Sequence, residues 1–273
     1  MFRFKFKKRK HKETEQEREF VEKEVRRIPK VISTIFFVYI VLFLIIMIWY
    51  FCFKSVYYIS KVEGSSMKPT INSGISDSSH ASEDFVYVNT KKKASHGDIV
   101  VLTQETNPII KRVIAKEGDQ VSIFVTEDGL YHVAIKYSWA ESPEILEENY
   151  VKSYREWRNS TAYSQTKTDS GIKYESVFYN TFINNGSGYN ENVSVIDGVY
   201  YYNVPTGNYF CLGDNRGVSS DSRARGTFTE NQIKGVADII VKGGSQATGN
   251  LALKKFSAIV SYYWKCLENT FAR

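Results

Sequence analysis

The sequence predicts a mostly β protein with one transmembrane helix near the N-terminus and an amphipathic helix at the C-terminus. An uncharged apolar run occupies residues 31–53, and short strand-like segments separated by turn signals fill much of the remainder. The 19 Tyr and 17 Phe against only 5 Pro favour strands over a helical bundle. Neither an internal repeat nor a helix–strand alternation is present, so a parallel βαβ sheet is not predicted.

The apolar run at residues 31–53 is long enough to cross a membrane. As a helix it would rise about 34 Å, against a hydrocarbon core of about 30 Å. Trp49 and Tyr50 lie near its end, where an aromatic belt is expected. A cleavable secretory signal fits less well, because its apolar part is usually only about 7–15 residues and no small-x-small cleavage site follows here. A buried helix of a soluble protein is the remaining alternative.

The positive charge of the chain is confined to its N-terminal tail. Residues 1–30 hold 12 Lys or Arg and 6 Glu, whereas residues 54–273 hold 24 basic and 24 acidic side chains. The positive-inside tendency predicts that residues 1–30 are a cytoplasmic tail and that the chain from residue 54 onward lies outside the cell membrane. A balanced main domain argues against nucleic-acid binding. Three scattered cysteines are too few for a disulfide framework or a Cys-rich zinc site, and we expect neither cofactor nor metal.

The chain beyond the apolar run divides into three predicted parts. A β-domain is expected from residues 54–125 and 199–245, with residues 126–198, rich in Tyr, Ser, Asn and Glu, forming an inserted subdomain. Residues 246–273 are expected to form an amphipathic helix, which either packs on the domain or lies at the membrane surface. The strand-like segments are 55–64, 84–89, 98–103, 109–116, 120–125, 199–204, 208–213 and 236–242.

Three short blocks carry candidate chemistry: GSSMKPT at 64–70, IIKRVIAKEGD at 109–119 and GDNRGVSSDSRARG at 213–226. A serine is a weak nucleophile until a base takes its proton. A lysine can be that base only when neutral, and burial among apolar side chains lowers its pKa from about 10.4. The second block offers Lys111 among Ile and Val residues. Because neighbouring side chains on a strand point to opposite faces, Lys111 and Arg112 are expected to have separate surroundings.

Together the blocks resemble the bacterial type I signal peptidases. The first fits the family pattern S-x-M-x-P-T, the second its Lys-Arg pair on a strand ending at Gly-Asp, and the third its pattern G-D-N-R-x-x-S-x-D-S-R at every fixed position. The resemblance covers roughly residues 31–125 and 199–242. It implies a signal-peptidase-like β-domain in which Ser66 is the nucleophile and Lys111 the general base.

The resemblance also implies roles for residues around this pair. Ser219 would orient the lysine amine, an Asp221–Arg223 ion pair would support the site from below, and Asp214 and Asn215 would shape the turn. The residues expected around the oxyanion and the substrate are Gly64, Ser65, Met67 and Pro69. Some family members have a serine where this chain has Gly64. The oxyanion must therefore be held by backbone N–H groups, chiefly that of Ser66, or by a side chain that the sequence does not identify.

The expected function is a membrane-bound serine endopeptidase that removes N-terminal signal peptides from exported preproteins. Its partners would be those signal peptides and the lipid bilayer, and we expect a monomer. The four histidines lack any motif, so a His-based triad is not predicted. A self-cleaving repressor of the Ser–Lys type is one alternative, which the membrane span argues against. An inactive membrane-anchored peptide-binding adaptor is another, which the intact Ser66, Lys111 and Ser219 argue against.

Overall fold

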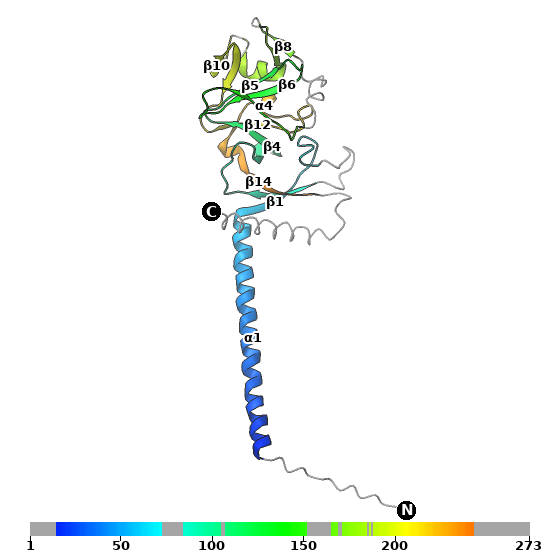
Figure 1. Cartoon of the computed structure of the whole chain (residues 1–273), viewed down its shortest axis with the longest axis vertical. Coiled ribbons are helices and arrows are strands. Elements are labelled where there is room, and N and C mark those ends of the chain that lie inside the picture. The colour runs from blue at the N-terminus through cyan, green and yellow to red at the C-terminus, as the bar shows by residue number, and fades with distance from the viewer. Residues whose placement is uncertain are drawn as a thin grey trace, which may run out of the picture. The chain divides into compact units, whose positions relative to one another are not determined.

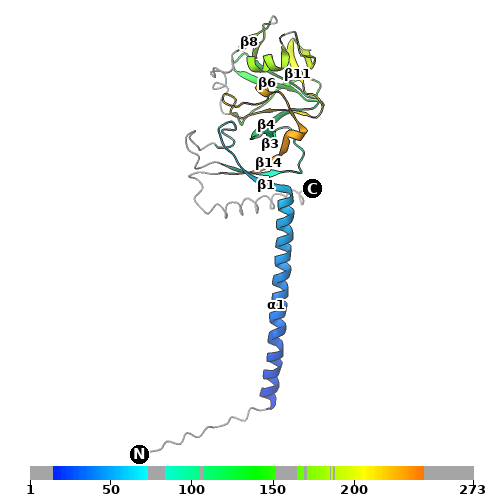
Figure 2. The same ribbon diagram turned by 180° about the vertical axis from the view of Figure 1, so that it is seen from behind.

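A computed structural model describes residues 15–72, 84–104, 107–151, 165–168, 171–184, 186 and 188–242. The chain divides into two compact units, residues 1–55 and 56–273. The predicted amphipathic helix at 246–273 lies outside the described residues. Figure 1 and Figure 2 give two opposite views of the chain.

The first unit is dominated by helix α1 (Glu15–Val56), 42 residues long. It includes the predicted span at 31–53 but begins much earlier, because the Glu-, Lys- and Arg-rich sequence before the span also forms helix readily. Acidic Glu15 and Glu17 lie in its first turn, where they interact favourably with the helix dipole. By length and composition α1 can cross a membrane, which fits a membrane-associated protein.

The second unit is mostly β and contains two antiparallel sheets, in agreement with the predicted class. The first sheet has seven strands. In spatial order they are β1 (Tyr57–Lys61), β2 (Phe85–Asn89), β14 (Ile233–Val241), β3 (Ile99–Gln104), β4 (Asn107–Lys116), β12 (Asn208–Leu212) and β13 (Phe228–Thr229). The sequence segment 55–64 was expected to be strand throughout, whereas α1 continues to Val56 and β1 starts only at Tyr57.

The second sheet is built around β5. Its main path is β10 (Val193–Ile196), β11 (Val199–Asn203), β5 (Gln120–Val125), β6 (Tyr131–Lys136) and β7 (Glu144–Ile145). A side branch adds β9 (Lys173–Glu175) and β8 (Gln165–Lys167). The described parts of 126–198 therefore share a sheet with the flanking strands β5 and β11. The inserted subdomain, as a separate domain, remains a prediction.

The two sheets meet along β4 and β12. In Figure 1 these strands lie between β14 and the second sheet, and Figure 2 shows β4 in the same place from behind. The largest apolar cluster combines side chains of the second sheet with Phe210 and Leu212 of β12 and with the short helices α3 (Ser176–Phe178) and η2 (Tyr179–Ile183). Two smaller apolar clusters belong to the first sheet.

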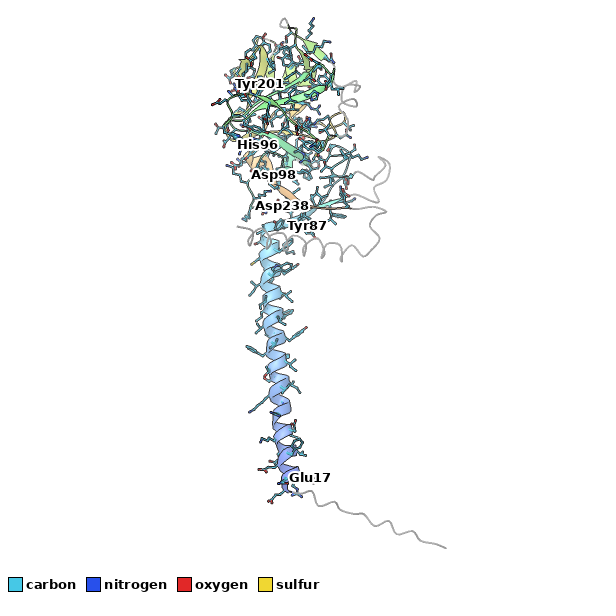
Figure 3. All side chains as sticks on the ribbon, in the orientation of Figure 1. Glu17, Tyr87, His96, Asp98, Tyr201 and Asp238 are labelled. Atoms are coloured by element: carbon cyan, nitrogen blue, oxygen red, sulfur yellow. The ribbon has the colours of Figure 1, made fainter. Side chains whose placement is uncertain are left out.

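Polar side chains link strands of the first sheet at its surface. Lys92 binds both Asp98, just before β3, and Asp238 on β14, each at 3.1 Å. Asp98 and Asp238 are labelled in Figure 3. Tyr57 on β1 also donates to Asp238, at 3.1 Å. These contacts tie the outer strands to the strand pair β3–β4, which carries Lys111.

Candidate active site

The first sequence block forms a compact loop directly after β1. Met67 and Ile71 are almost fully buried and anchor the loop in one of the smaller apolar clusters. The backbone N–H of Ile71 donates to the carbonyl of Met67 at 2.9 Å, so the loop closes as a turn of helix type. Ser66, one residue before Met67, remains partly accessible. Pro69 follows a cis peptide bond from Lys68.

Lys111 lies on β4, opposite Val100 of β3, and its side chain is only 3% exposed. Its Nζ is 3.1 Å from Ser66 Oγ and donates to the Ile110 carbonyl at 2.8 Å. Burial lowers the pKa of Lys111 below its usual value, and the cations Arg225 and Arg223 act in the same direction, while Asp221 opposes them. A lysine with this environment releases its proton more readily than one in water.

The third block packs beneath the pair. The Asp221 carboxylate is buried and receives hydrogen bonds from Arg223 Nε at 2.8 Å and from the Gly213 N–H at 3.0 Å. Although burial alone would raise the pKa of Asp221, the Arg223 guanidinium and the hydrogen bonds from Gly213 and Ser219 hold it below its usual value. The ion pair expected between Asp221 and Arg223 is therefore present in the structure.

Gly213 makes room for the approach of this block to the nucleophile loop. A Cβ at this position would lie 2.1 Å from Ser219 Oγ and 2.6 Å from the Ser66 carbonyl oxygen. Only glycine fits there without displacing backbone or the Ser219 side chain. Ser219 is buried in the same cluster as Asp221. Its predicted contact with the Lys111 amine remains a prediction.

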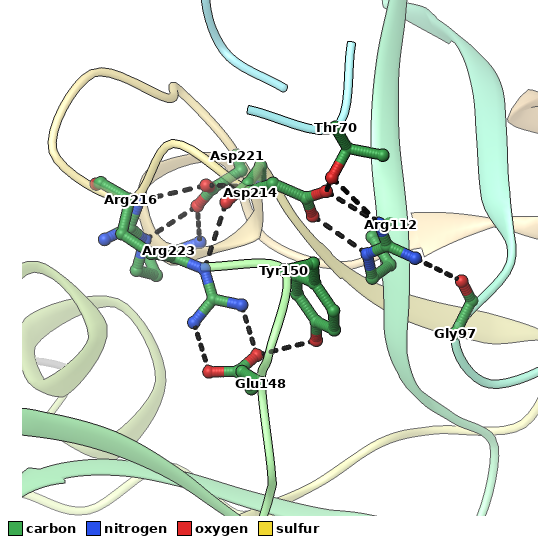
Figure 4. Close-up of polar contacts among 10 residues, drawn as sticks. Thr70, Gly97, Arg112, Glu148, Tyr150, Asp214, Arg216, Asp221 and Arg223 are labelled. Atoms are coloured by element: carbon green, nitrogen blue, oxygen red, sulfur yellow. Dashed lines mark hydrogen bonds and ion pairs between the residues drawn. The ribbon is translucent and has the colours of Figure 1, made fainter. Parts of the chain in front are cut away.

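Two further predicted residues join the blocks to one another. The Asn215 N–H donates to the Ser66 carbonyl at 3.0 Å, and the Asn215 side chain donates to the Ser65 carbonyl at 3.1 Å. Asp214 binds the Arg112 guanidinium through both oxygens, at 2.8 and 2.6 Å (Figure 4). Lys111 and Arg112, adjacent on β4, thus have different partners.

The sequence did not identify a second support of the nucleophile loop, centred on Asn72. This residue has a left-handed backbone (φ 61°), which asparagine tolerates better than most residues. Its side-chain amide donates to the carbonyls of Val62 at 3.0 Å and Gly64 at 2.9 Å. Its Oδ1 accepts the Asp84 N–H at 2.8 Å, and Asp84 Oδ2 accepts the Asn72 N–H at 2.8 Å. No sequence signal predicted this support, because a lone Ile-Asn-Ser segment does not reveal a left-handed backbone.

A cavity of about 590 Å³ opens beside Ser66 and Lys111. Its apolar wall comes from Val62, Val86, Val101, Pro108, Ile109 and Ile110, and its polar rim from Ser60, Lys61, Glu63 and Asn107. The aliphatic wall of this cavity, next to a serine, suits a small apolar group of a bound peptide. Within the described ranges, no three His, Cys, Asp or Glu side chains are grouped so as to hold a metal ion.

Comparison with known proteins gives consistent matches. The family model described as "Signal peptidase, peptidase S26" matches residues 31–242. The chain is 30% identical over 224 residues to signal peptidase I of Aquifex aeolicus, covering 74% of this chain and 82% of the relative. It is 31% identical over 179 residues to signal peptidase I of Streptococcus pneumoniae, covering 65% and 78%. A solved signal peptidase I from Enterococcus faecalis is 24% identical, with coverage of 53% and 97% and a TM-score of 0.31.

Proposed function

Since the chain belongs to the signal peptidase family, peptidase S26, and is therefore a serine-type peptidase whose substrates are preprotein signal peptides, we propose that Ser66 and Lys111 carry out its reaction. The observation that carries the proposal is the 3.1 Å separation of Lys111 Nζ from Ser66 Oγ, with the lysine buried. A nucleophile and its base must lie within about 3.2 Å or be joined by one water.

The proposed reaction has two steps. In the first, neutral Lys111 takes the Ser66 hydroxyl proton while Ser66 Oγ attacks the scissile carbonyl, and the lysine then gives that proton to the leaving amine. The signal peptide remains as an ester on Ser66. In the second, Lys111 takes a proton from water, the hydroxide attacks the ester, and the proton returns to Ser66 Oγ. The peptide is released with a new carboxylate, and the enzyme regains its starting state.

The neighbouring residues support this proposal through contacts with the same loop. Asn215 holds the carbonyls of Ser65 and Ser66, which fixes the backbone N–H groups available to an oxyanion. The Asp221–Arg223 pair lies next to the lysine, and Arg223 also donates to the Ser219 carbonyl at 3.3 Å, which holds the third block together. Gly64 offers no side chain, so we propose that the Ser66 N–H is the main oxyanion donor.

We also propose the membrane arrangement. Residues 1–30 would be a cytoplasmic tail, residues 31–53 would cross the membrane within α1, and the catalytic residues from 54 onward would lie outside. The excess of Lys and Arg in residues 1–30 supports this direction. Protease added outside sealed right-side-out vesicles should digest the β-domain and spare an N-terminal epitope; the opposite pattern would reverse the assigned topology.

The deciding experiment measures cleavage of a preprotein by the purified full chain. Ser66→Ala and Lys111→Ala should each lower kcat by about 10⁴-fold or more, because removal of either member of a nucleophile–base pair abolishes the shared step. Lys116→Ala, another lysine on β4, is the matched control and should cleave like the wild type. Equal cleavage by wild type and both dyad variants would show that the assigned pair is wrong.

The pH profile provides an independent test. Because only the neutral lysine accepts a proton, kcat/KM should rise with pH through the lowered pKa of Lys111 and level off above it. The rise should occur below the usual lysine range near pH 10.4. A profile that is flat from mildly acidic to alkaline pH would remove Lys111 from the role of general base.

A further inference from the structure

A short segment after β7 reaches both arginines that flank the candidate site. Glu148 and Tyr150, two residues apart, contact Arg216 and Arg112 (Figure 4). Building on the proposed function, we propose that Glu148 and Tyr150 are positioning residues for the peptidase reaction. They would hold each arginine, and through it the neighbouring residue, Asn215 or Lys111, in its working geometry. No sequence motif includes either residue.

The first contact is a fully buried ion pair. The side chains of Glu148 and Arg216 are both inaccessible to solvent. Arg216 Nη1 donates to Glu148 Oε2 at 2.8 Å, and Arg216 Nη2 donates to Glu148 Oε1. A guanidinium does not lose its proton in a protein, so a buried arginine requires an anionic partner. The position of Arg216 is therefore dictated by Glu148.

The position of Arg216 in turn fixes the turn that binds the nucleophile loop. Arg216 Nε donates to the Gly213 carbonyl at 3.0 Å, and its own carbonyl accepts Arg223 Nη2 at 2.8 Å. The preceding residue, Asn215, donates its backbone N–H to the Ser66 carbonyl. A displacement of Arg216 would therefore shift Asn215 and, through its hydrogen bond, the backbone of Ser66.

The second contact lies beside the lysine. The Arg112 guanidinium carbon is 4.0 Å from the centre of the Tyr150 ring, in cation–π geometry. The Tyr150 hydroxyl donates to Glu148 Oε1 at 2.8 Å, so the two residues of the segment support one another. The ring covers Arg112 while Asp214 binds it in the plane of its nitrogens. Arg112 is held from two directions, and Lys111 immediately precedes it on the same strand.

Through these two contacts the segment would position the reacting residues without taking part in the reaction itself. Neither Glu148 nor Tyr150 is among the residues that line the cavity beside Ser66, so we assign neither of them a contact with the group bound there. Loss of either should therefore lower kcat, which depends on the alignment of Ser66 and Lys111, and leave KM nearly unchanged. A purely structural role would lower the melting temperature without this separation of kcat from KM.

The test measures kcat and KM of the full chain in detergent with a preprotein substrate. Glu148→Gln and Tyr150→Leu should each lower kcat by about tenfold to a hundredfold, the range expected for misplacement of reacting groups, with KM within about twofold of wild type. Tyr150→Phe keeps the ring over Arg112 and should restore most of the activity lost in Tyr150→Leu. The exposed neighbour Glu147 supplies the matched control, Glu147→Gln, with wild-type kinetics expected.

The proposal is overturned if Glu148→Gln and Tyr150→Leu keep wild-type kcat while folded, or if Tyr150→Phe is as inactive as Tyr150→Leu. Should Glu148→Gln fail to fold, the Tyr150 variants decide alone, because they leave the ion pair intact. Failure of the proposed function looks different, since Ser66→Ala would then cleave like the wild type. Loss of activity in the dyad variants with full kcat in the segment variants would reject the positioning role only.

Discussion

The two sheets of the second unit, residues 56–273, bury very different side chains. Around the second sheet the buried residues are mainly aromatic and aliphatic, and Phe178, Phe182 and Phe210 form a continuous group with ring centroids 5.3–6.1 Å apart. Next to the first sheet the apolar clusters are small, and buried ionisable side chains and one amide lie between them and the loops. These are Asn72, Asp84, Lys111, Asp214, Arg216, Asp221 and Arg223.

This difference indicates that the aromatic side stabilises the fold, whereas the polar side positions the residues of the candidate site. Aromatic burial is strong but not directional, so it stabilises a domain without fixing any group to within a few tenths of an ångström. Hydrogen-bonded ions add little net stability but are directional, and they are costly to disturb. We therefore expect changes on the aromatic side to affect unfolding free energy, and changes on the polar side to affect kcat.

The largest expected loss of stability follows from Phe178→Ala. The Phe178 side chain is fully buried and its ring lies 5.5 Å from that of Phe182. Its truncation should lower the free energy of unfolding by about 3–5 kcal/mol, because it removes apolar contacts and leaves a cavity. Urea unfolding of the full chain in detergent measures this loss. Val195→Ala, at a position 58% exposed on β10, is the control and should change stability little.

The kinetics of Phe178→Ala test whether the aromatic side affects stability alone or also positions the Ser66–Lys111 pair. At a temperature where the variant is folded, kcat should stay within about twofold of wild type, since no polar contact of the site involves this ring. A tenfold drop in kcat with little change in stability would show that the aromatic side positions the dyad as well.

The sequence predicted most strands but not the elements that depend on distant partners. The segment 120–125 is strand β5 as predicted, because its β-branched and aromatic residues favour a strand locally. Helices α3 and η2, at Ser176–Ile183, were not predicted. Their sequence SVFYNTFI has weak helix propensity, and the structure forms because Phe178 and Phe182 pack on β12.

The same limit applies to the candidate site. Ser66, Lys111 and the third block were found because they fit short family patterns. Glu148 and Arg216 are 68 residues apart, and nothing in the local sequence of Glu148 distinguishes it from the exposed Glu147. Asn72 and Asp84 likewise pair across 12 residues without a pattern. Pairs of buried polar groups depend on the folded geometry, which a single sequence does not contain.

A second test concerns Glu175, a fully buried carboxyl group next to the aromatic cluster. Burial raises the pKa of Glu175 to about 7, although Arg223 and the Phe178 N–H oppose the shift. The folded protein then keeps a proton between about pH 4.5 and 7 that the unfolded chain releases. Stability should therefore fall as pH rises through this window and stay level above it.

Glu175→Gln should remove this dependence. Relative to the variant, wild type should lose up to about 1.4 kcal/mol of unfolding free energy for each pH unit between about 4.5 and 7. Urea unfolding of both proteins at several pH values measures the difference. If Glu175 belongs to the aromatic side, which affects stability and not the reaction, the two proteins should also have the same pH profile of kcat/KM. A difference between them that is independent of pH would contradict the raised pKa.

The smallest expected change in stability comes from variants of Asn72, on the polar side. These variants are also the most direct test of the difference between the aromatic and the polar side. Asn72→Ala removes the donors to the Val62 and Gly64 carbonyls and should cost about 1–3 kcal/mol. Asn72→Gly loses the same hydrogen bonds but tolerates the left-handed backbone, so any difference between the variants measures backbone strain. Both should lower kcat more than Phe178→Ala does, because the released carbonyls belong to the loop of Ser66. If both variants retain kcat within twofold while losing stability, buried hydrogen bonds beside the first sheet are structural, and the proposed division between the two sides fails.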